Sequence, residues 1–129
     1  RIDRVMDTTG QSFWLETEEQ LDAVTALSGS GPAYVFYFME AMTTAGVEMG
    51  LRREQAQQLA VATFAGASAL AAASDETPQT LRQRVTSKGG TTFAAISSLE
   101  DNDVRALFID ALYAARERAK ELGDEFGSL

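Results

Sequence analysis

The residues Arg53–Ala73 constrain the fold most strongly, because the sequence predicts a helix there with apolar residues on every side. These apolar residues are Leu59, Val61, Phe64, Ala65, Ala67, Ala69, Leu70 and Ala72. A helix that is apolar all round has to be buried all round, and a small monomeric bundle has few positions of that kind. We expect the helix to lie between the two subunits of an interlocked dimer. The alternative is the central helix of a monomer.

The longest uncharged stretch, residues 55–74, raises the question of a membrane span. It is rich in Ala, also contains Gln, Thr and Ser, and has only two Leu. A bilayer span needs about 20 strongly apolar residues. We therefore expect no membrane-spanning segment.

The composition excludes several kinds of chemistry. The 129 residues suit one domain with one hydrophobic core. The chain contains no Cys and no His, so it forms no disulfide and lacks both the commonest metal ligand and the usual general base. Its 11 basic and 19 acidic residues give a formal net charge of -8, which argues against general nucleic-acid binding. We expect no metal site and no nucleic-acid partner.

Residues 1–16 differ from the rest of the chain. Ser12–Leu15 is short and contains two aromatic residues after Thr9 and Gly10, which is typical of a strand. A lone strand is not stable by itself, so we expect its sheet to include strands outside this chain. The chain also opens at Arg1 without an initiator Met or a visible signal peptide. We therefore expect it to be an excerpt of a longer protein.

From Thr17 onward the pattern is helical. Thr17 followed by Gln20 has the spacing of a capping box. Helices are predicted over about residues 17–27, 32–48, 53–73, 77–85, 91–99 and 104–125. The fold class expected is therefore all-α, a helical bundle of about six helices that forms an interlocked dimer.

Residues 28–32, Ser-Gly-Ser-Gly-Pro, are predicted to break the chain between the first two helices. Pro32 fits a helix start, where its missing N–H costs nothing. The segment also looks like an anion-binding loop, but Ser and Gly are ordinary linker residues before a helix. It lacks the G-x-G-x-x-G spacing of a dinucleotide site.

The segment most able to carry chemistry joins the fourth and fifth predicted helices. Its residues are Thr86, Ser87, Lys88, Gly89, Gly90, Thr91 and Thr92. The glycines permit a tight turn, and the first turn of the helix that follows exposes unpaired N–H groups at the positive end of its dipole. Such a site suits a carboxylate or a phosphate. The alternative is a plain turn in which Thr91 only caps the helix.

Three pairs of neighbouring carboxylates are candidates for catalysis or metal binding. They are Glu18 with Glu19, Asp75 with Glu76, and Glu100 with Asp101. On the predicted helices they fall at ends or on exposed faces. We expect them to be solvated.

Three segments resemble the C-terminal domain of pyrroline-5-carboxylate reductases. Residues 22–36 (DAVTALSGSGPAYVF) are very similar to the opening of that domain, and residues 81–92 (LRQRVTSKGGTT) resemble the family's signature. Residues 45–51 (AGVEMGL) also fit. The resemblance covers nearly everything after Glu16, and residues 1–16 look like the last strand and linker of the family's N-terminal Rossmann domain.

The resemblance implies an oxidoreductase of proline biosynthesis, which reduces L-1-pyrroline-5-carboxylate to L-proline with NADPH or NADH in the cytoplasm. It also implies that the nucleotide lies mainly on the Rossmann domain, absent from this chain. Residues 17–129 would then form the helical substrate-binding and dimerisation domain of a homodimer, which many members assemble into a homodecamer. The fragment alone is expected to be inactive.

By resemblance, residues 86–92 bind the substrate. Ser87 and the backbone N–H groups of Gly90 and Thr91 would donate hydrogen bonds to its carboxylate, and the Thr92 hydroxyl would lie near the ring nitrogen as the catalytic group. Many members have Pro where this chain has Lys88, which bears on the stiffness of the loop. Two other interpretations stay open: a non-catalytic helical dimerisation module, and a related dehydrogenase acting on another small imino or hydroxy acid.

Overall fold

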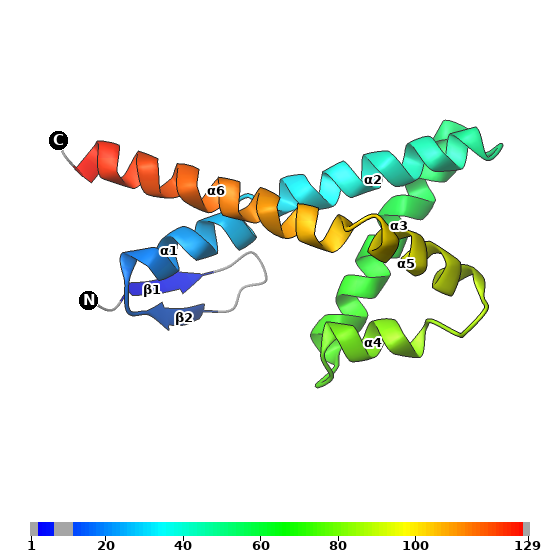
Figure 1. Ribbon diagram of the computed structural model, residues 1–129, viewed down its shortest axis with the longest axis horizontal. Coiled ribbons are helices and arrows are strands. Elements are labelled where there is room, and N and C mark those ends of the chain that lie inside the picture. Colours follow the sequence, from blue (N-terminus) through cyan, green and yellow to red (C-terminus); the bar gives the residue numbers. More distant parts are fainter. Residues whose placement is uncertain (1–2, 7–11, 128–129) are drawn as a thin grey trace. The chain divides into compact units, whose positions relative to one another are not determined.

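The computed structural model describes residues 3–6 and 12–127, which are helical apart from one short hairpin (Figure 1). The strands are β1 (Asp3–Met6) and β2 (Ser12–Leu15). The helices are α1 (Glu18–Val24), a π-helical turn η1 (Thr25–Gly29), α2 (Gly31–Glu48), α3 (Arg53–Ala73), α4 (Pro78–Arg84), α5 (Thr91–Asp101) and α6 (Val104–Gly127). The predicted all-α class is confirmed, with six α-helices in the described residues.

The chain divides into two compact units. The first contains residues 1–34 and 104–129, and the second contains residues 35–103. The division falls within α2 and before α6. The predicted domain boundary at residue 16 is a different boundary, and it stays a prediction.

The hairpin contains one strand that the sequence analysis did not foresee. β1 and β2 pair antiparallel, with Asp3 opposite Leu15 and Met6 opposite Ser12. β2 confirms the predicted strand. β1 was missed because it opens with two charged residues and has no aromatic side chain. A two-stranded hairpin is marginal in water by itself, so further strands outside this chain stay a prediction.

The start of α1 confirms the predicted capping residues. The Gln20 N–H donates to Thr17 Oγ1 at 3.1 Å. The Gln20 side-chain oxygen accepts from the N–H of Glu16, one residue before the cap, at 2.6 Å. Two N–H groups that the helix cannot satisfy internally are therefore satisfied by side chains.

The predicted break at residues 28–32 is shorter than expected: η1 ends at Gly29, Ser30 is a bend, and α2 begins at Gly31 with Pro32 in its first turn. Ser28 and Gly29 still belong to the π-helical turn. The Ser30 N–H donates to the carbonyl of Thr25 at 2.9 Å, the wider spacing of a π-turn. The Ser28 hydroxyl donates to the Val24 carbonyl at 3.1 Å, and the Tyr34 hydroxyl donates to the carbonyl of Ala26 at 2.7 Å. Hydroxyl donors thus satisfy carbonyls around the widened turn. The Ser28 hydroxyl and the Ser30 N–H are used within the chain, so these two donors give no support to the anion-binding interpretation.

The first unit is held together by α6, which lies along α1 and η1 (Figure 1). The rings of Tyr34 and Phe108 meet edge to face at 5.6 Å, a favourable arrangement for aromatic pairs. Ala26 is buried here, with 4% of its surface exposed. An apolar groove of about 280 Å³ also lies between η1 and α6, lined in part by Leu27, Ile109 and Tyr113.

In the second unit, α2 and α3 approach most closely where small residues meet. Gly46, Ala56 and Ala60 are buried there. A Cβ built on Gly46 would lie 2.8 Å from the Cβ of Ala56, closer than carbon atoms can pack. Gly46 is therefore needed for the approach of the two helices.

The rest of α3 is not buried within its unit. Leu59 is 58% exposed, Val61 46% and Leu70 56%. By length and composition α3 could cross a membrane, with a mean hydropathy of 1.2, but this value comes largely from Ala rather than from strongly apolar residues. The core helix of an assembly meets the same criterion, and exposed apolar surface of this extent indicates an interface.

Replacing Gly46 by Ala is expected to destabilise the protein by about 1–3 kcal/mol, because the added methyl group overpacks the contact with Ala56. Urea unfolding followed by circular dichroism measures this. Gly123→Ala on α6 is the matched control, since a Cβ there meets nothing within 4 Å. It should stabilise the helix by up to about 1 kcal/mol. Equal effects of the two substitutions would contradict the packing role of Gly46.

Candidate functional site

The candidate site is the loop that joins α4 to α5 (Figure 1). At its start the chain leaves α4 through a closed helix end. The Thr86 hydroxyl donates to the Arg82 carbonyl at 2.5 Å, and the Thr86 N–H donates to the Gln83 carbonyl at 3.2 Å. Both of these Thr86 donors are used by α4. Thr86 is predicted to bind the substrate, but in the structure its hydroxyl and N–H hold the start of the loop against the end of α4.

Residues 87–90 form a tight turn. The Gly90 N–H donates to the Ser87 carbonyl at 3.0 Å, and Gly89 has φ +80°. Among the described residues the one non-glycine with positive φ is Asp103, so Lys88 is in the ordinary region. A positive φ at the third position alone is the pattern of a type II turn. Pro suits the second position of that turn, so the Pro that the resemblance leads one to expect at position 88 would fit this geometry, and Lys88 leaves the backbone there less restricted.

α5 begins without a side-chain cap. Gly90 occupies the N-cap position with extended backbone angles (φ -88°, ψ -179°), and no side chain accepts a hydrogen bond from the first turn. Thr91 is the first helical residue, so the alternative in which Thr91 caps the helix is wrong. The amides of Thr91 and Thr92 are thus at the positive end of the dipole of an 11-residue helix. Such amides can donate to an anion.

The turn brings Ser87 to the start of α5. A Cβ built on Gly90 would lie 2.7 Å from Ser87 Oγ and 3.3 Å from the Ser87 carbonyl oxygen. The Ser87 hydroxyl therefore lies directly against the backbone of Gly90, and a side chain at position 90 would displace it. Ser87 is exposed and Thr92, in the first turn of α5, is half-buried.

One predicted donor is used elsewhere. The resemblance assigns the Gly90 N–H to the substrate carboxylate, whereas in the structure this group closes the turn onto Ser87. The backbone donors of the first turn that remain for a ligand are those of Thr91, Thr92 and Phe93, since the first helical bond of α5 runs from the Ala94 N–H to the Gly90 carbonyl. Lys88 is exposed, and the first turn of α5 has no acidic residue, so the local charge favours an anion.

Metal binding has no support in the part of the chain that the structure describes. Across residues 3–6 and 12–127, no three or more His, Cys, Asp or Glu side chains gather where they could hold an ion. Glu18 and Glu19 lie in the first turn of α1, where acidic side chains interact favourably with the helix dipole.

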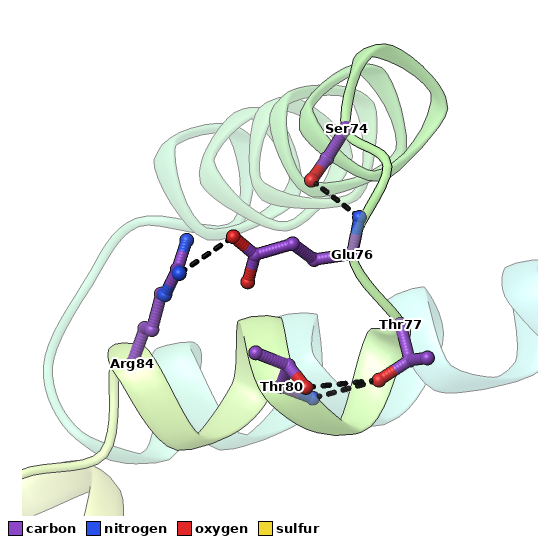
Figure 2. Close-up of polar contacts among 5 residues, drawn as sticks. All are labelled: Ser74, Glu76, Thr77, Thr80 and Arg84. Atoms are coloured by element: carbon purple, nitrogen blue, oxygen red, sulfur yellow. Dashed lines mark hydrogen bonds and ion pairs between the residues drawn. The ribbon is translucent and has the colours of Figure 1, made fainter.

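Glu76 differs from the solvated carboxylate that the sequence predicts. Its Oε1 pairs with the guanidinium of Arg84 at 2.5 Å (Figure 2). Its Oε2 is shielded from solvent and has no hydrogen-bond partner. The pair is not predicted from the sequence, because the two residues are eight positions apart, outside the i,i+3 and i,i+4 spacings of a single helix face. The signal in the sequence was an acidic residue just before a short predicted helix, together with an arginine at the end of that helix.

Comparison with known proteins gives consistent matches. The family model described as pyrroline-5-carboxylate reductase dimerisation matches residues 18–122. The chain is 48% identical over 124 residues to a pyrroline-5-carboxylate reductase of Pseudomonas aeruginosa, covering 96% of this chain and 45% of the relative. It is 38% identical over 122 residues to pyrroline-5-carboxylate reductase 2 of Bacillus subtilis, covering 95% and 44%.

Solved structures agree. The Plasmodium falciparum pyrroline carboxylate reductase with NADP bound superposes with a TM-score of 0.79 at 38% identity, covering 84% of this chain and 41% of that chain. A pyrroline-5-carboxylate reductase of Coxiella burnetii gives 0.79 at 48% identity, covering 84% and 40%. The chain spans less than half the length of these relatives. With a family model matched over most of its residues, the chain belongs to the pyrroline-5-carboxylate reductase dimerisation family.

Proposed function

We propose that this chain is the substrate-binding and dimerisation part of a pyrroline-5-carboxylate reductase, which reduces L-1-pyrroline-5-carboxylate to L-proline with NADPH or NADH. The observation that carries the proposal is the start of α5, which has no side-chain cap and lies against the Ser87 hydroxyl. A small carboxylate would complete this helix end. Relatives named as this reductase support the choice of substrate.

The substrate carboxylate would lie at the start of α5. It would accept hydrogen bonds from the Ser87 hydroxyl and from the amides of Thr91 and Thr92, with Lys88 adding a positive charge nearby. Anions at a helix N-terminus gain from both the free N–H groups and the dipole. Gly89 and Gly90 would serve the site by letting the turn close tightly.

The reaction needs little from the side chains beyond position and polarity. When bound, a nicotinamide cofactor would supply the hydride for the carbon of the substrate's C=N bond, and the ring nitrogen would take its proton from water. The Thr92 hydroxyl, in the first turn of α5, would hydrogen-bond the ring nitrogen that becomes the amine of proline. Such chemistry does not require histidine, in agreement with a chain that has none. Binding of the cofactor is assigned to the Rossmann domain upstream, of which residues 1–16 would be the end.

The assembly would be a homodimer in which α3 is covered by the second subunit. The exposed Leu59, Val61 and Leu70 support this part of the proposal. On the same family membership we also propose further assembly into a decamer, a soluble cytoplasmic location and a place in proline biosynthesis. The exposed face of α3 also favours the second candidate, a dimerisation module without catalysis. A Rossmann domain in the natural gene, and turnover by the full-length protein, would distinguish the two.

Replacing Thr92 by Val in the full-length protein is expected to lower kcat by about 10- to 100-fold, because it removes a hydroxyl that assists a proton or hydrogen-bond step. Steady-state NADPH oxidation with pyrroline-5-carboxylate measures this. Thr25→Val on η1 is the matched control, since the exposed Thr25 hydroxyl donates to the Leu21 carbonyl one turn before it. Unchanged kinetics in Thr92→Val would remove Thr92 from the mechanism.

Replacing Gly90 by Val is expected to raise the KM for pyrroline-5-carboxylate, because the new side chain would displace the Ser87 hydroxyl. Titration calorimetry with proline provides an independent measure of binding. Gly123→Val serves as the control, where a Cβ meets open space. Normal substrate binding by Gly90→Val would overturn the proposed anion site.

Replacing Leu59 and Leu70 by Gln is expected to dissociate the dimer. Both side chains are more than half exposed within the chain. In a monomer such surface changes would alter stability by less than about 0.5 kcal/mol. Burial of each leucine at an interface is worth about 1.5–3 kcal/mol. Sedimentation velocity gives the result, and a parent chain that sediments as a monomer at every concentration would contradict the proposed dimer.

A further inference from the structure

Glu76 and Arg84 join the two ends of α4. Glu76 lies two residues before the helix and Arg84 is its last residue, so the ion pair at 2.5 Å spans a helix about 10 Å long. Figure 2 shows the Glu76 side chain reaching along α4 to the guanidinium. A contact of this kind opposes any change in the direction of α4 relative to the chain before it.

The backbone around Glu76 is itself held in place (Figure 2). The Glu76 N–H donates to the Ser74 hydroxyl oxygen at 3.0 Å. Thr77 accepts from the Thr80 N–H at 3.2 Å and so caps α4, and its hydroxyl also donates to that of Thr80 at 3.0 Å. The backbone from which the Glu76 side chain extends is therefore held in place.

The other end of the pair leads directly to the candidate site. Arg84 is followed by Val85, whose N–H donates to the Arg82 carbonyl at 3.3 Å, and by Thr86, whose hydroxyl donates to the same carbonyl. Ser87 comes next. The direction of the last turn of α4 thus sets the place from which the Ser87 turn begins.

The Glu76 carboxylate depends on Arg84 for its charge balance. Its Oε2 is shielded from solvent and has no hydrogen-bond partner, and the whole side chain is 33% exposed. Without the guanidinium, a partly desolvated carboxylate would lack its counter-charge and would turn toward water. Loss of either side chain therefore removes the contact that restrains the direction of α4.

We propose that the Glu76–Arg84 pair is a positioning device for the substrate loop. By fixing α4 it fixes Ser87 against the start of α5, and so it sets the affinity for the substrate rather than the rate of the chemical step. This inference rests on the proposed function of residues 86–92. Glu76 and Arg84 are both positioning residues, which act on the loop through α4.

The test is made in the full-length protein with Glu76→Gln and Arg84→Gln. Each should raise the KM for pyrroline-5-carboxylate by about 3- to 10-fold, the effect of a modest coupling within one network, and leave kcat within about twofold. The Tm should stay within about 5 °C of the parent, since exposed ion pairs contribute little to stability. Arg118→Gln is the matched control. It removes an ion pair to Glu121 on α6, at 3.0 Å with both side chains more than 60% exposed, and should leave KM unchanged.

The two substitutions separate positioning from simple electrostatic attraction of the anion. If Arg84 acted only by its charge, Glu76→Gln would leave KM unchanged or lower it, since the cation would be less neutralised. That result would overturn the proposal. The exchanged pair, Glu76→Arg with Arg84→Glu, should restore KM to within about twofold if the ion pair itself matters. A KM that stays as high as in the single variants would overturn it as well.

A second measurement tests the positioning role independently of the proposed function. Amide hydrogen exchange of residues 86–92 should become at least about 3-fold faster in both single variants and unchanged in Arg118→Gln, because an unclamped α4 leaves the loop less ordered. If the parent protein failed to reduce pyrroline-5-carboxylate, the proposed function would fail. Unchanged exchange in Glu76→Gln and Arg84→Gln would instead refute the positioning role.

Discussion

The apolar surface of α3 is the constraint on which the rest of this structure depends. Its large side chains, Leu59 and Leu70 among them, are more than half exposed within the chain, while the residues that it does bury are the small Ala56 and Ala60. Leaving such surface in water forgoes about 1.5–3 kcal/mol for each large side chain. In the proposed dimer the second unit would gain stability by association, in keeping with a family model described as dimerisation.

That dependence connects assembly with chemistry. α4 and the loop after it continue directly from α3, so whatever holds α3 also fixes the base from which residues 86–92 extend. Local hydrogen bonds then hold the two ends of α4. Ser74 and Thr77 hold the chain before α4 and the Thr86 hydroxyl closes its end. A helix start left without a side-chain cap is useful only if its direction is well defined.

Much of the fold followed from the sequence because its signals were local. The bounds of α3 were predicted at 53–73, as the structure has them, and the Thr17 cap was predicted from spacing alone. One expectation was only partly met. Ser28 and Ser30 predict a break, yet hydroxyl and backbone bonds keep Ser28 and Gly29 in η1, so that only Ser30 separates η1 from α2. There the longer-range bond from the Tyr34 hydroxyl adds to local bonds that outweigh the propensity of Ser and Gly.

For the candidate site, the sequence by itself predicted residues 86–92 as the place for an anion. Two glycines before an uncharged helix start, with hydroxyls beside them, define that chemistry through covalent geometry and the helix dipole. The fold decided which groups remain available. It used the Gly90 N–H to close the turn and made Gly90 the N-cap of α5. It also paired Glu76 with Arg84. These outcomes depend on where chain segments meet in space, because a donor or a charge has one partner at a time and spacing along the chain does not say which partner is nearest.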